Sequence, residues 1–152
     1  MTLPLLRQIW FHLCISCKGV TKSIKNITSS DITLAKAYFT ILVETAIKGT
    51  IISYGDLVSI SKERFSDDKD VLSGTAIKAG RRLEVLRMHT DLFDLADISC
   101  LVVNASSHEV GGSYHLKAEV ETLVVAVHNT HWLHYFTSVN KALDMTRAEY
   151  EL

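Results

Sequence analysis

The sequence predicts a mostly helical α+β domain with helical extensions at both ends. Residues 31–48 carry an apolar stripe with helical period, and residues 99–104 form a short β-branched run. A basic helical segment lies between them. The chain of 152 residues is 47% hydrophobic and 22% charged, so it can bury a core and fold on its own.

The segment 1–30 is assigned to a short helix and a linker. Apolar residues at helical spacing predict an amphipathic helix over 1–19, and polar residues follow as the linker. Arg7 and His12 interrupt the apolar residues, which argues against a membrane span or a signal peptide. Together with the odd number of cysteines, this favours a cytoplasmic protein with reduced thiols.

Residues 31–145 are assigned to a single domain, which begins with the clearest helix of the chain. The cluster Ser29-Ser30-Asp31 is expected to cap this helix, because short side-chain oxygens accept hydrogen bonds from free first-turn amides. Gly49 is its expected C-terminal stop. The stripe expected in the core consists of Ala35, Tyr38, Phe39, Leu42, Val43 and Ala46.

Two further helices are expected before the strand. Ser53 and Asp56 resemble a capping box at the start of a helix that runs to about Ser61. The polar residues 62–70 form a turn, and the second helix covers 71–88. Its inward face is predicted to hold Leu72, Ala76, Gly80, Leu83 and Leu86.

The rest of the chain is predicted as a strand, an exposed turn and two helices. The strand covers 99–104, and the turn covers 105–112. A helix is favoured over 117–128, although a β-rich run inside it also permits a strand. Another helix spans 129–140, and residues 146–152 are assigned to a polar tail.

The order helix, helix, strand and Gly-rich turn is typical of a winged helix-turn-helix. The net charge is −1, so nucleic acid would have to be bound through a local basic patch, such as the one on the second helix. Arg can bind guanine edges and Lys can bind phosphates. A solvated helix face without function is the alternative. The residues predicted to face DNA are Thr75, Lys78, Arg81 and Arg82 on the helix and Ser106, Ser107 and His108 on the wing.

The segment Ile52-Ser53-Tyr54-Gly55-Asp56-Leu57 resembles the opening of the winged-helix domain of alkylguanine DNA alkyltransferases and alkyltransferase-like proteins. The resemblance extends over residues 52–114 and includes Ser99-Cys100-Leu101-Val102 and Val110-Gly111-Gly112-Ser113-Tyr114. The chain is also similar to small uncharacterised prokaryotic and phage winged-helix proteins. The alkyltransferase resemblance implies a DNA-reading scaffold in which Arg81 or Arg82 takes the place of the family's helix-intercalating arginine.

The alkyl-transfer chemistry of that family is not implied. Its reactive cysteine is followed by a histidine, whereas Cys100 is followed by Leu101 and Val102. A thiol in such an apolar run is expected to be a core residue with an ordinary or raised pKa. The chain is therefore interpreted as a non-enzymatic DNA-binding module without a cofactor, and double-stranded DNA is its expected partner.

Two groups of residues have the types, but not the full pattern, of a metal site. Cys14 and Cys17 form a lone Cys-x-x-Cys pair, and His128, His131 and His134 follow one another at three-residue spacing. A structural zinc site needs four ligands at suitable spacing, which neither group supplies. Both groups are interpreted as ordinary buried or surface side chains, and metal binding is left open.

A second interpretation is a small protein-interaction or inhibitor protein, for example one encoded by a phage or mobile element and acting on a host defence complex. The near-neutral charge suits this function, and Trp132, Tyr135 and Phe136 would be its exposed contacts. A third interpretation is a divergent enzyme that uses Cys100 or the three histidines of residues 128–134. A homodimer through 31–48 or the C-terminal helices is left open.

Overall fold

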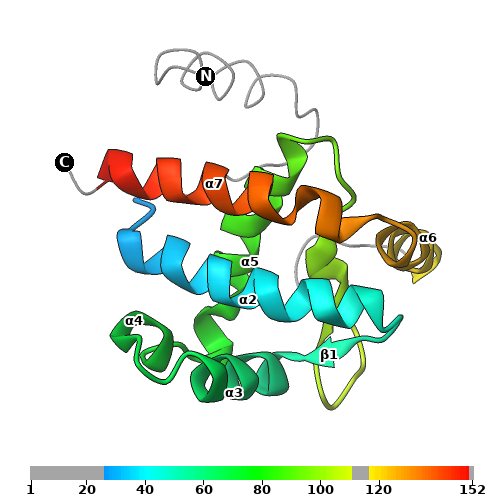
Figure 1. The fold of residues 1–152 in the computed structure, drawn as a ribbon. Coiled ribbons are helices and arrows are strands. Elements are labelled where there is room, and N and C mark those ends of the chain that lie inside the picture. Colours follow the sequence, from blue (N-terminus) through cyan, green and yellow to red (C-terminus); the bar gives the residue numbers. More distant parts are fainter. Residues whose placement is uncertain (1–25, 111–116, 151–152) are drawn as a thin grey trace.

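The computed structural model describes residues 26–110 and 117–150, which form a helical domain with a small parallel sheet (Figure 1). The predicted mostly helical α+β class is therefore confirmed. The helix predicted over 1–19, most of the linker and the Cys14/Cys17 pair lie outside the described residues. No helix within the described part is long and apolar enough to cross a membrane.

Helix α2 (Ser29–Ile47) begins at a capping box. The Thr28 hydroxyl accepts a hydrogen bond from the Asp31 backbone N–H at 3.1 Å, and the Asp31 carboxylate accepts one from the Thr28 N–H at 3.0 Å. The cap therefore lies one residue before the predicted cluster. At the other end, Gly49 follows the C-cap with a φ of +67°, as expected of a C-terminal glycine.

Helix α2 lies in the middle of the domain. Every residue of its predicted apolar stripe is buried. It packs against α5 (Ala76–Asp91) and α7 (Trp132–Tyr150), and also contacts the shorter helices α3 (Tyr54–Arg64) and α4 (Lys69–Leu72). Because neighbours surround it, this helix is buried on most of its circumference and not on a single face.

The segment predicted as the second helix is divided in the structure. Ser53 caps α3 as expected, since its hydroxyl accepts the Asp56 N–H at 3.1 Å. However, α3 continues to Arg64, and α4 and α5 are separated by a break at residues 73–75. Ser73 ends α4 as its C-cap, and Thr75 starts α5 as its N-cap. Gly74 between them packs closely on α2, because an added Cβ there would lie 3.0 Å from both Leu34 and the Tyr38 hydroxyl.

The buried side of α5 differs in part from the predicted one. Leu83 and Leu86 are buried as predicted, but Leu72, Ala76 and Gly80 are exposed. Ala79 lies close to two full turns before Leu86 and is buried with it, so the inward position is Ala79 and not Gly80. Leu72 belongs to the separate helix α4.

Strands β1 (Ile52–Ser53) and β2 (Val102–Val103) pair in parallel, with Ile52 opposite Val102. The strand predicted over 99–104 is shorter, because Ile98–Leu101 forms the 3₁₀ helix η1. Asp97 stabilises this turn: its carboxylate accepts the Ser99 backbone N–H at 3.0 Å and the Ser99 hydroxyl at 2.6 Å.

The C-terminal part is helical, as expected. Helix α6 (Lys117–His128) matches the favoured prediction. Helix α7 starts at Trp132 but extends to Tyr150, so the assignment of 146–152 to a polar tail is wrong for most of that segment. Thr146 shows why, since it is buried and its hydroxyl donates to the Ala142 carbonyl at 3.0 Å.

Candidate nucleic-acid interface

The first two turns of α5 are exposed on most of their circumference, with Ala79 as their buried residue. Thr75 is the N-cap, and its hydroxyl accepts the Lys78 backbone N–H. The side chains of Ile77 and Lys78 are exposed, and so are the positions of Ala76 and Gly80. Such a helix start presents backbone N–H groups and the positive end of the helix dipole to the solvent.

Arg81 and Arg82 converge on Asp31 at the start of α2. Their Nε atoms each lie 3.0 Å from an Asp31 carboxylate oxygen. Arg81 also donates to the Asn26 carbonyl at 2.6 Å, and Arg82 to the Lys78 carbonyl at 3.0 Å. The Arg82 side chain is only 11% exposed, against 38% for Arg81. The prediction of a shared outward face is therefore wrong for Arg82.

The Asp31 carboxylate holds this cluster together from a buried position. Burial by itself would raise its pKa, but hydrogen bonds from Thr28 and Arg81 and the charge of Arg81 hold that pKa below the ordinary value. Sequence reasoning identified Asp31 only as a helix cap. Its partnership with Arg81, 50 positions away, is a tertiary contact that no local pattern indicates.

The predicted wing is an exposed hairpin. Residues 104–109 are exposed throughout, and Val103 and Val110 form an antiparallel bridge at its base. The Asn104 N–H donates to the Glu109 carbonyl at 2.9 Å, and the His108 N–H donates to the Asn104 carbonyl at 2.8 Å. Ser106, Ser107 and His108 are thus accessible, and this loop lies at the same end of the molecule as α3 in Figure 1.

Cys100 lies inside the protein, as its apolar neighbours predict. It is fully buried in η1. Burial raises the pKa of its thiol to about 12, and the nearby negative charge of Asp97 contributes to the increase. A thiol with this pKa is almost entirely protonated at neutral pH and is a poor nucleophile.

The aromatic residues of α7 are more buried than expected of the contact residues of an interaction protein. Trp132 is 1% exposed, and its indole N–H donates to the Val127 carbonyl at 2.8 Å. Phe39 of α2 packs edge-on against Trp132, with ring centroids 6.1 Å apart, and stacks on Phe136 at 5.5 Å. The prediction of an exposed Trp132 is wrong, while Phe136 and Tyr135 are partly buried.

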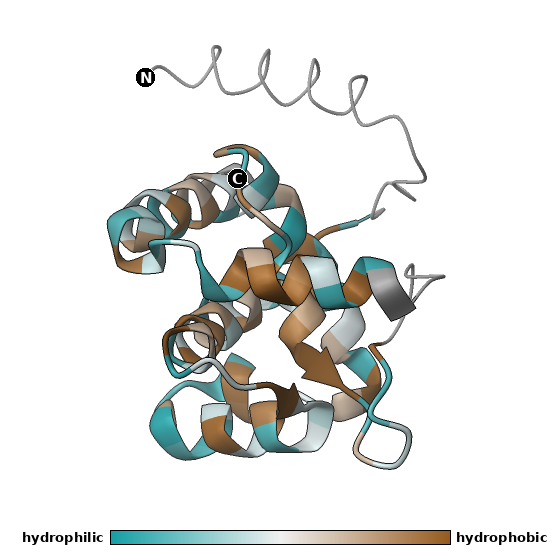
Figure 2. Cartoon of the chain, turned by 90° about the vertical axis from the view of Figure 1, so that its right-hand side faces the viewer, coloured by the Kyte–Doolittle hydropathy of each residue, from teal (hydrophilic) through white to brown (hydrophobic). Residues whose placement is uncertain are grey.

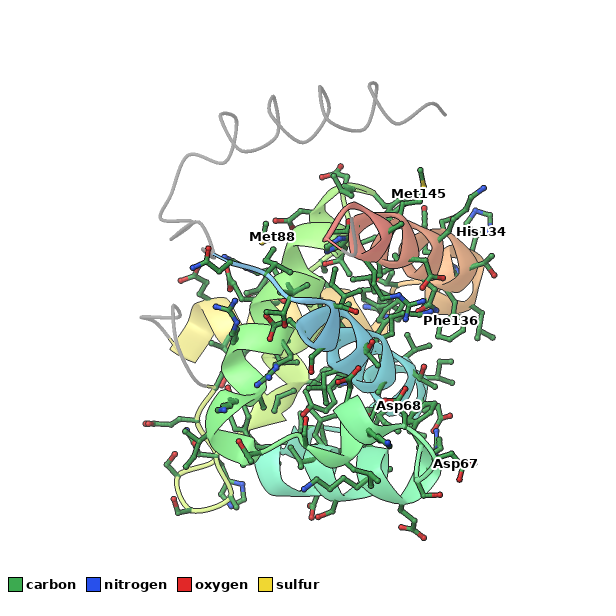
Figure 3. All side chains as sticks on the ribbon, turned by 90° about the vertical axis from the view of Figure 1, so that its left-hand side faces the viewer. Asp67, Asp68, Met88, His134, Phe136 and Met145 are labelled. Atoms are coloured by element: carbon green, nitrogen blue, oxygen red, sulfur yellow. The ribbon has the colours of Figure 1, made fainter. Side chains whose placement is uncertain are left out.

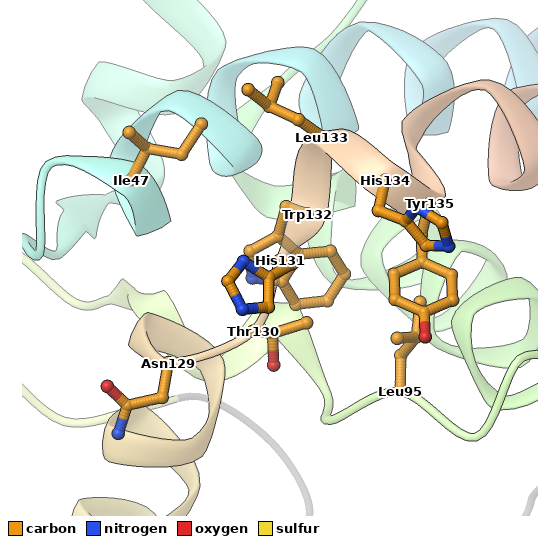
Figure 4. A pocket seen from close by; sticks show the side chains of 9 residues that line it. All are labelled: Ile47, Leu95, Asn129, Thr130, His131, Trp132, Leu133, His134 and Tyr135. Atoms are coloured by element: carbon orange, nitrogen blue, oxygen red, sulfur yellow. The ribbon is translucent and has the colours of Figure 1, made fainter.

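An open pocket of about 730 Å³ lies beside the start of α7 (Figure 4). Its walls come from the end of α2, from Leu95 and from the turn between α6 and α7. Ile47 and Leu133 at its edge are 58% and 74% exposed. The complete lining is Ile47, Leu95, Asn129, Thr130, His131, Trp132, Leu133, His134 and Tyr135.

The three histidines at the α6–α7 turn have separate surroundings. His128 Nε2 lies 3.0 Å from the Thr50 carbonyl, which ties α6 to the chain after α2. His131 and His134 are exposed at the pocket, and His134 packs edge-on against Tyr135. Among the described residues, no group of three or more His, Cys, Asp or Glu side chains is arranged to hold a metal ion.

A buried histidine that the sequence did not indicate joins α5 to α7. His89 is fully buried, with Nδ1 2.7 Å from the Val85 carbonyl and Nε2 2.8 Å from the Thr146 hydroxyl. Because a carbonyl only accepts, Nδ1 carries the proton of the neutral ring, and the single proton of the Thr146 hydroxyl is shared between Nε2 and the Ala142 carbonyl. Burial lowers the pKa of His89, against the opposing effect of the Val85 hydrogen bond.

Comparison of the chain with protein-family models, with curated proteins and with solved structures finds no match in any of the three. The resemblance of residues 52–114 to the alkyltransferases therefore stays a prediction from the residues themselves. The class of protein has to be argued from the exposed start of α5 and the surfaces around it.

Proposed function

We propose that the chain is a non-enzymatic DNA-binding module of the winged-helix type, with α5 as its recognition helix and residues 104–109 as its wing. The exposed start of α5 is the observation that carries the proposal. In helix-turn-helix proteins, the first residues of the second helix contact base edges. The order of α3, α4, α5, β2 and an exposed hairpin supports the same assignment.

The electrostatics of this surface predict weak attraction to DNA. Lys78 is exposed, but Asp31 partly neutralises Arg81 and Arg82, and the hairpin carries the exposed Glu109. Two cations that contact phosphates would give a slope of roughly −2 when log affinity is plotted against log salt. We therefore expect a moderate salt dependence and a contribution from contacts other than ion pairs.

The proposal is tested by fluorescence anisotropy with a random-sequence DNA duplex, at low salt and at about 0.15 M salt. Lys78→Glu should weaken binding several-fold and reduce the salt slope by about one. Lys141→Glu makes the same charge change on the exposed side of α7 and is the matched control. Substitution of Arg82 is unsuitable, because it would leave the buried Asp31 carboxylate with one partner fewer.

Absence of binding by the unaltered chain at low salt would reject the proposal. An equal loss in the two charge-reversal variants would also reject it, because binding would then follow total charge and not the start of α5.

A second candidate function is the binding of a protein partner near the pocket. Figure 2 looks onto the end of the molecule that carries α6, whose residues 123–127 are all hydrophobic. Of the six large hydrophobic side chains exposed in the described residues, four belong to this end of the molecule. These four are Ile47, Ile51, Val125 and Leu133.

An apolar surface of this kind suits an interaction or inhibitor protein, including a second copy of the chain. Leu133→Asp should then abolish self-association in analytical ultracentrifugation, or capture of the partner, without changing DNA anisotropy. Unchanged association would remove this surface from consideration.

A further inference from the structure

We propose that Ile77 contacts the 5-methyl group of a thymine in the DNA bound by α5 and so selects a T·A pair at one position. The inference rests on the proposed DNA-binding function. Ile77 is 96% exposed, more than any other large hydrophobic side chain in the described part of the protein. Because the fold leaves this side chain almost entirely in water, it contributes almost no apolar burial to the core.

The surroundings of Ile77 allow another molecule to approach closely. Ala76 beside it and Gly80 one turn later are both exposed. A Cβ placed on Gly80 would meet nothing within 4 Å. Residues three apart on a helix lie on the same side, so Ile77 projects next to a position that has no side chain. The helix backbone can therefore come near a partner surface while Ile77 reaches into it.

The charges around Ile77 favour DNA over an apolar protein surface. Lys78 follows directly, and Arg81 lies one turn further along the helix with its side chain 38% exposed. Within residues 75–81, Ile77 is the one large apolar side chain. A single apolar group flanked by cations matches the edge of a major groove, where the thymine methyl is an apolar group and phosphates border the groove.

The apolar side chains near the pocket show the opposite arrangement, because several of them share that end of the molecule. A clustered apolar surface is typical of protein partners, whose hot spots are surrounded by further packing contacts. Ile77 does not belong to such a cluster within its own helix. Its isolation therefore favours a small apolar target such as the methyl group of a thymine.

The test uses a duplex selected by the full chain from a random-sequence library. Each thymine of the selected duplex is replaced in turn by deoxyuridine, which lacks only the 5-methyl group. The dissociation constant is measured by anisotropy for the unaltered chain and for Ile77→Ala. At one position, deoxyuridine should weaken binding by the unaltered chain about three- to fivefold, as expected for one buried methyl group.

The variant Ile77→Ala should bind the thymine duplex about three- to fivefold more weakly than the unaltered chain does. Replacing the thymine by deoxyuridine should then cause no further loss of affinity. Such non-additivity shows that the two groups contact one another. Alanine suits an exposed helical position, and an unchanged thermal midpoint confirms that the variant is folded. Leu133→Ala removes an exposed apolar side chain elsewhere and should keep the full thymine preference.

The outcomes separate the inference from the function on which it rests. If the unaltered chain binds no DNA at low salt, the proposed function fails and the inference fails with it. If it binds DNA but the library yields no preferred sequence, or no single thymine is sensitive to deoxyuridine, DNA binding stands and the thymine contact is rejected. Equal sensitivity of Ile77→Ala and the unaltered chain to deoxyuridine also rejects the contact.

Discussion

The start of α5 and the pocket beside α7 both expose apolar side chains, but with different neighbours. At α5, Ile77 lies beside Lys78 and a partly neutralised Arg81. At the pocket, Ile47 and Leu133 belong to a described lining that includes no Asp, Glu, Lys or Arg. In Figure 3, His134 on α7 lies on the opposite side of the view from the hairpin of residues 104–109. Exposed apolar area alone therefore does not define a partner. The charges beside it distinguish a surface suited to DNA from one suited to a protein.

The two regions are also held in place by different forces. Asp31 fixes the middle of α5 through ion pairs with Arg81 and Arg82. The start of α7 is fixed by aromatic packing of Trp132 on Phe39. Changes at Asp31 should therefore affect the start of α5, and changes at Trp132 should affect the pocket beside α7.

The largest expected effect is at the pocket. Trp132→Ala removes a buried aromatic ring and should lower the free energy of unfolding by about 3–5 kcal/mol, because a cavity replaces its contacts. Urea denaturation measures the loss. Leu133→Ala, at the adjacent exposed position, should change stability by no more than about 0.5 kcal/mol. Similar losses in the two variants would contradict the packing role of Trp132.

A smaller effect is expected at α5. Asp31→Asn keeps the side-chain shape but removes the charge that pairs with Arg81 and Arg82, at a cost of roughly 2–3 kcal/mol in stability. The same change leaves both arginines without their counter-charge, so DNA affinity should rise as stability falls. Asp144→Asn, which breaks the more exposed ion pair with Lys36, is the control and should cost at most about 1 kcal/mol.

The Asp31 contribution should also depend on pH. Its pKa is lower in the folded protein than the ordinary value of 3.8, so the ionised carboxylate stabilises the fold. This stabilisation is complete above the unfolded pKa and is lost as the pH falls through the folded pKa. The stability difference between the unaltered chain and Asp31→Asn should therefore shrink in acid. A constant difference down to low pH would contradict this assignment.

The smallest expected effect is at His89, which joins the C-terminal parts of α5 and α7. Burial keeps its folded pKa below the ordinary value of 6.5, so the unfolded chain takes up a proton first as the pH falls. Stability from the neutral ring is present above pH 6.5 and decreases below it, by at most about 1.4 kcal/mol per pH unit. Thermal midpoints measured across this range should fall less in His89→Gln than in the unaltered chain.

His131→Gln, at an exposed position, is the control for the pH experiment and should retain the pH dependence. If His89→Gln and the unaltered chain respond equally to acid, another group is responsible. Because His89 joins α5 to α7, hydrogen exchange should show whether the C-terminal parts of these two helices open together at low pH.

Local signals in the sequence predicted much of the helical framework. The apolar period of α2, the Ser53 cap and the C-terminal Gly49 all act within a few residues, and the structure has each of them. The break at residues 73–75 was not predicted, and neither was the close packing of Gly74 on Leu34 and Tyr38 of α2. A close approach of this kind depends on how helices pack, and a single segment does not reveal it.

The candidate site was predicted less well than the fold, for a related reason. Counting positive charges identified the basic helix, but Arg82 is largely taken up by an ion pair with a residue far earlier in the chain. Trp132 was predicted as an exposed contact of an interaction protein, yet its ring packs against Phe39. Composition indicates which groups are present, while their availability to a partner depends on tertiary contacts.

The packing of α2 against α7 has a consequence for the synthesis of the protein. Lys36 Nζ on α2 lies 2.6 Å from Asp144 Oδ1 on α7, although the two residues are 108 positions apart in the chain. A ribosome adding about 5–20 residues per second takes roughly 5–20 seconds to make the residues between them. During that time, the most apolar helix of the described part is without the helix that covers one of its sides. Until α7 emerges, the apolar surface on that side of α2 can therefore contact other unfolded chains.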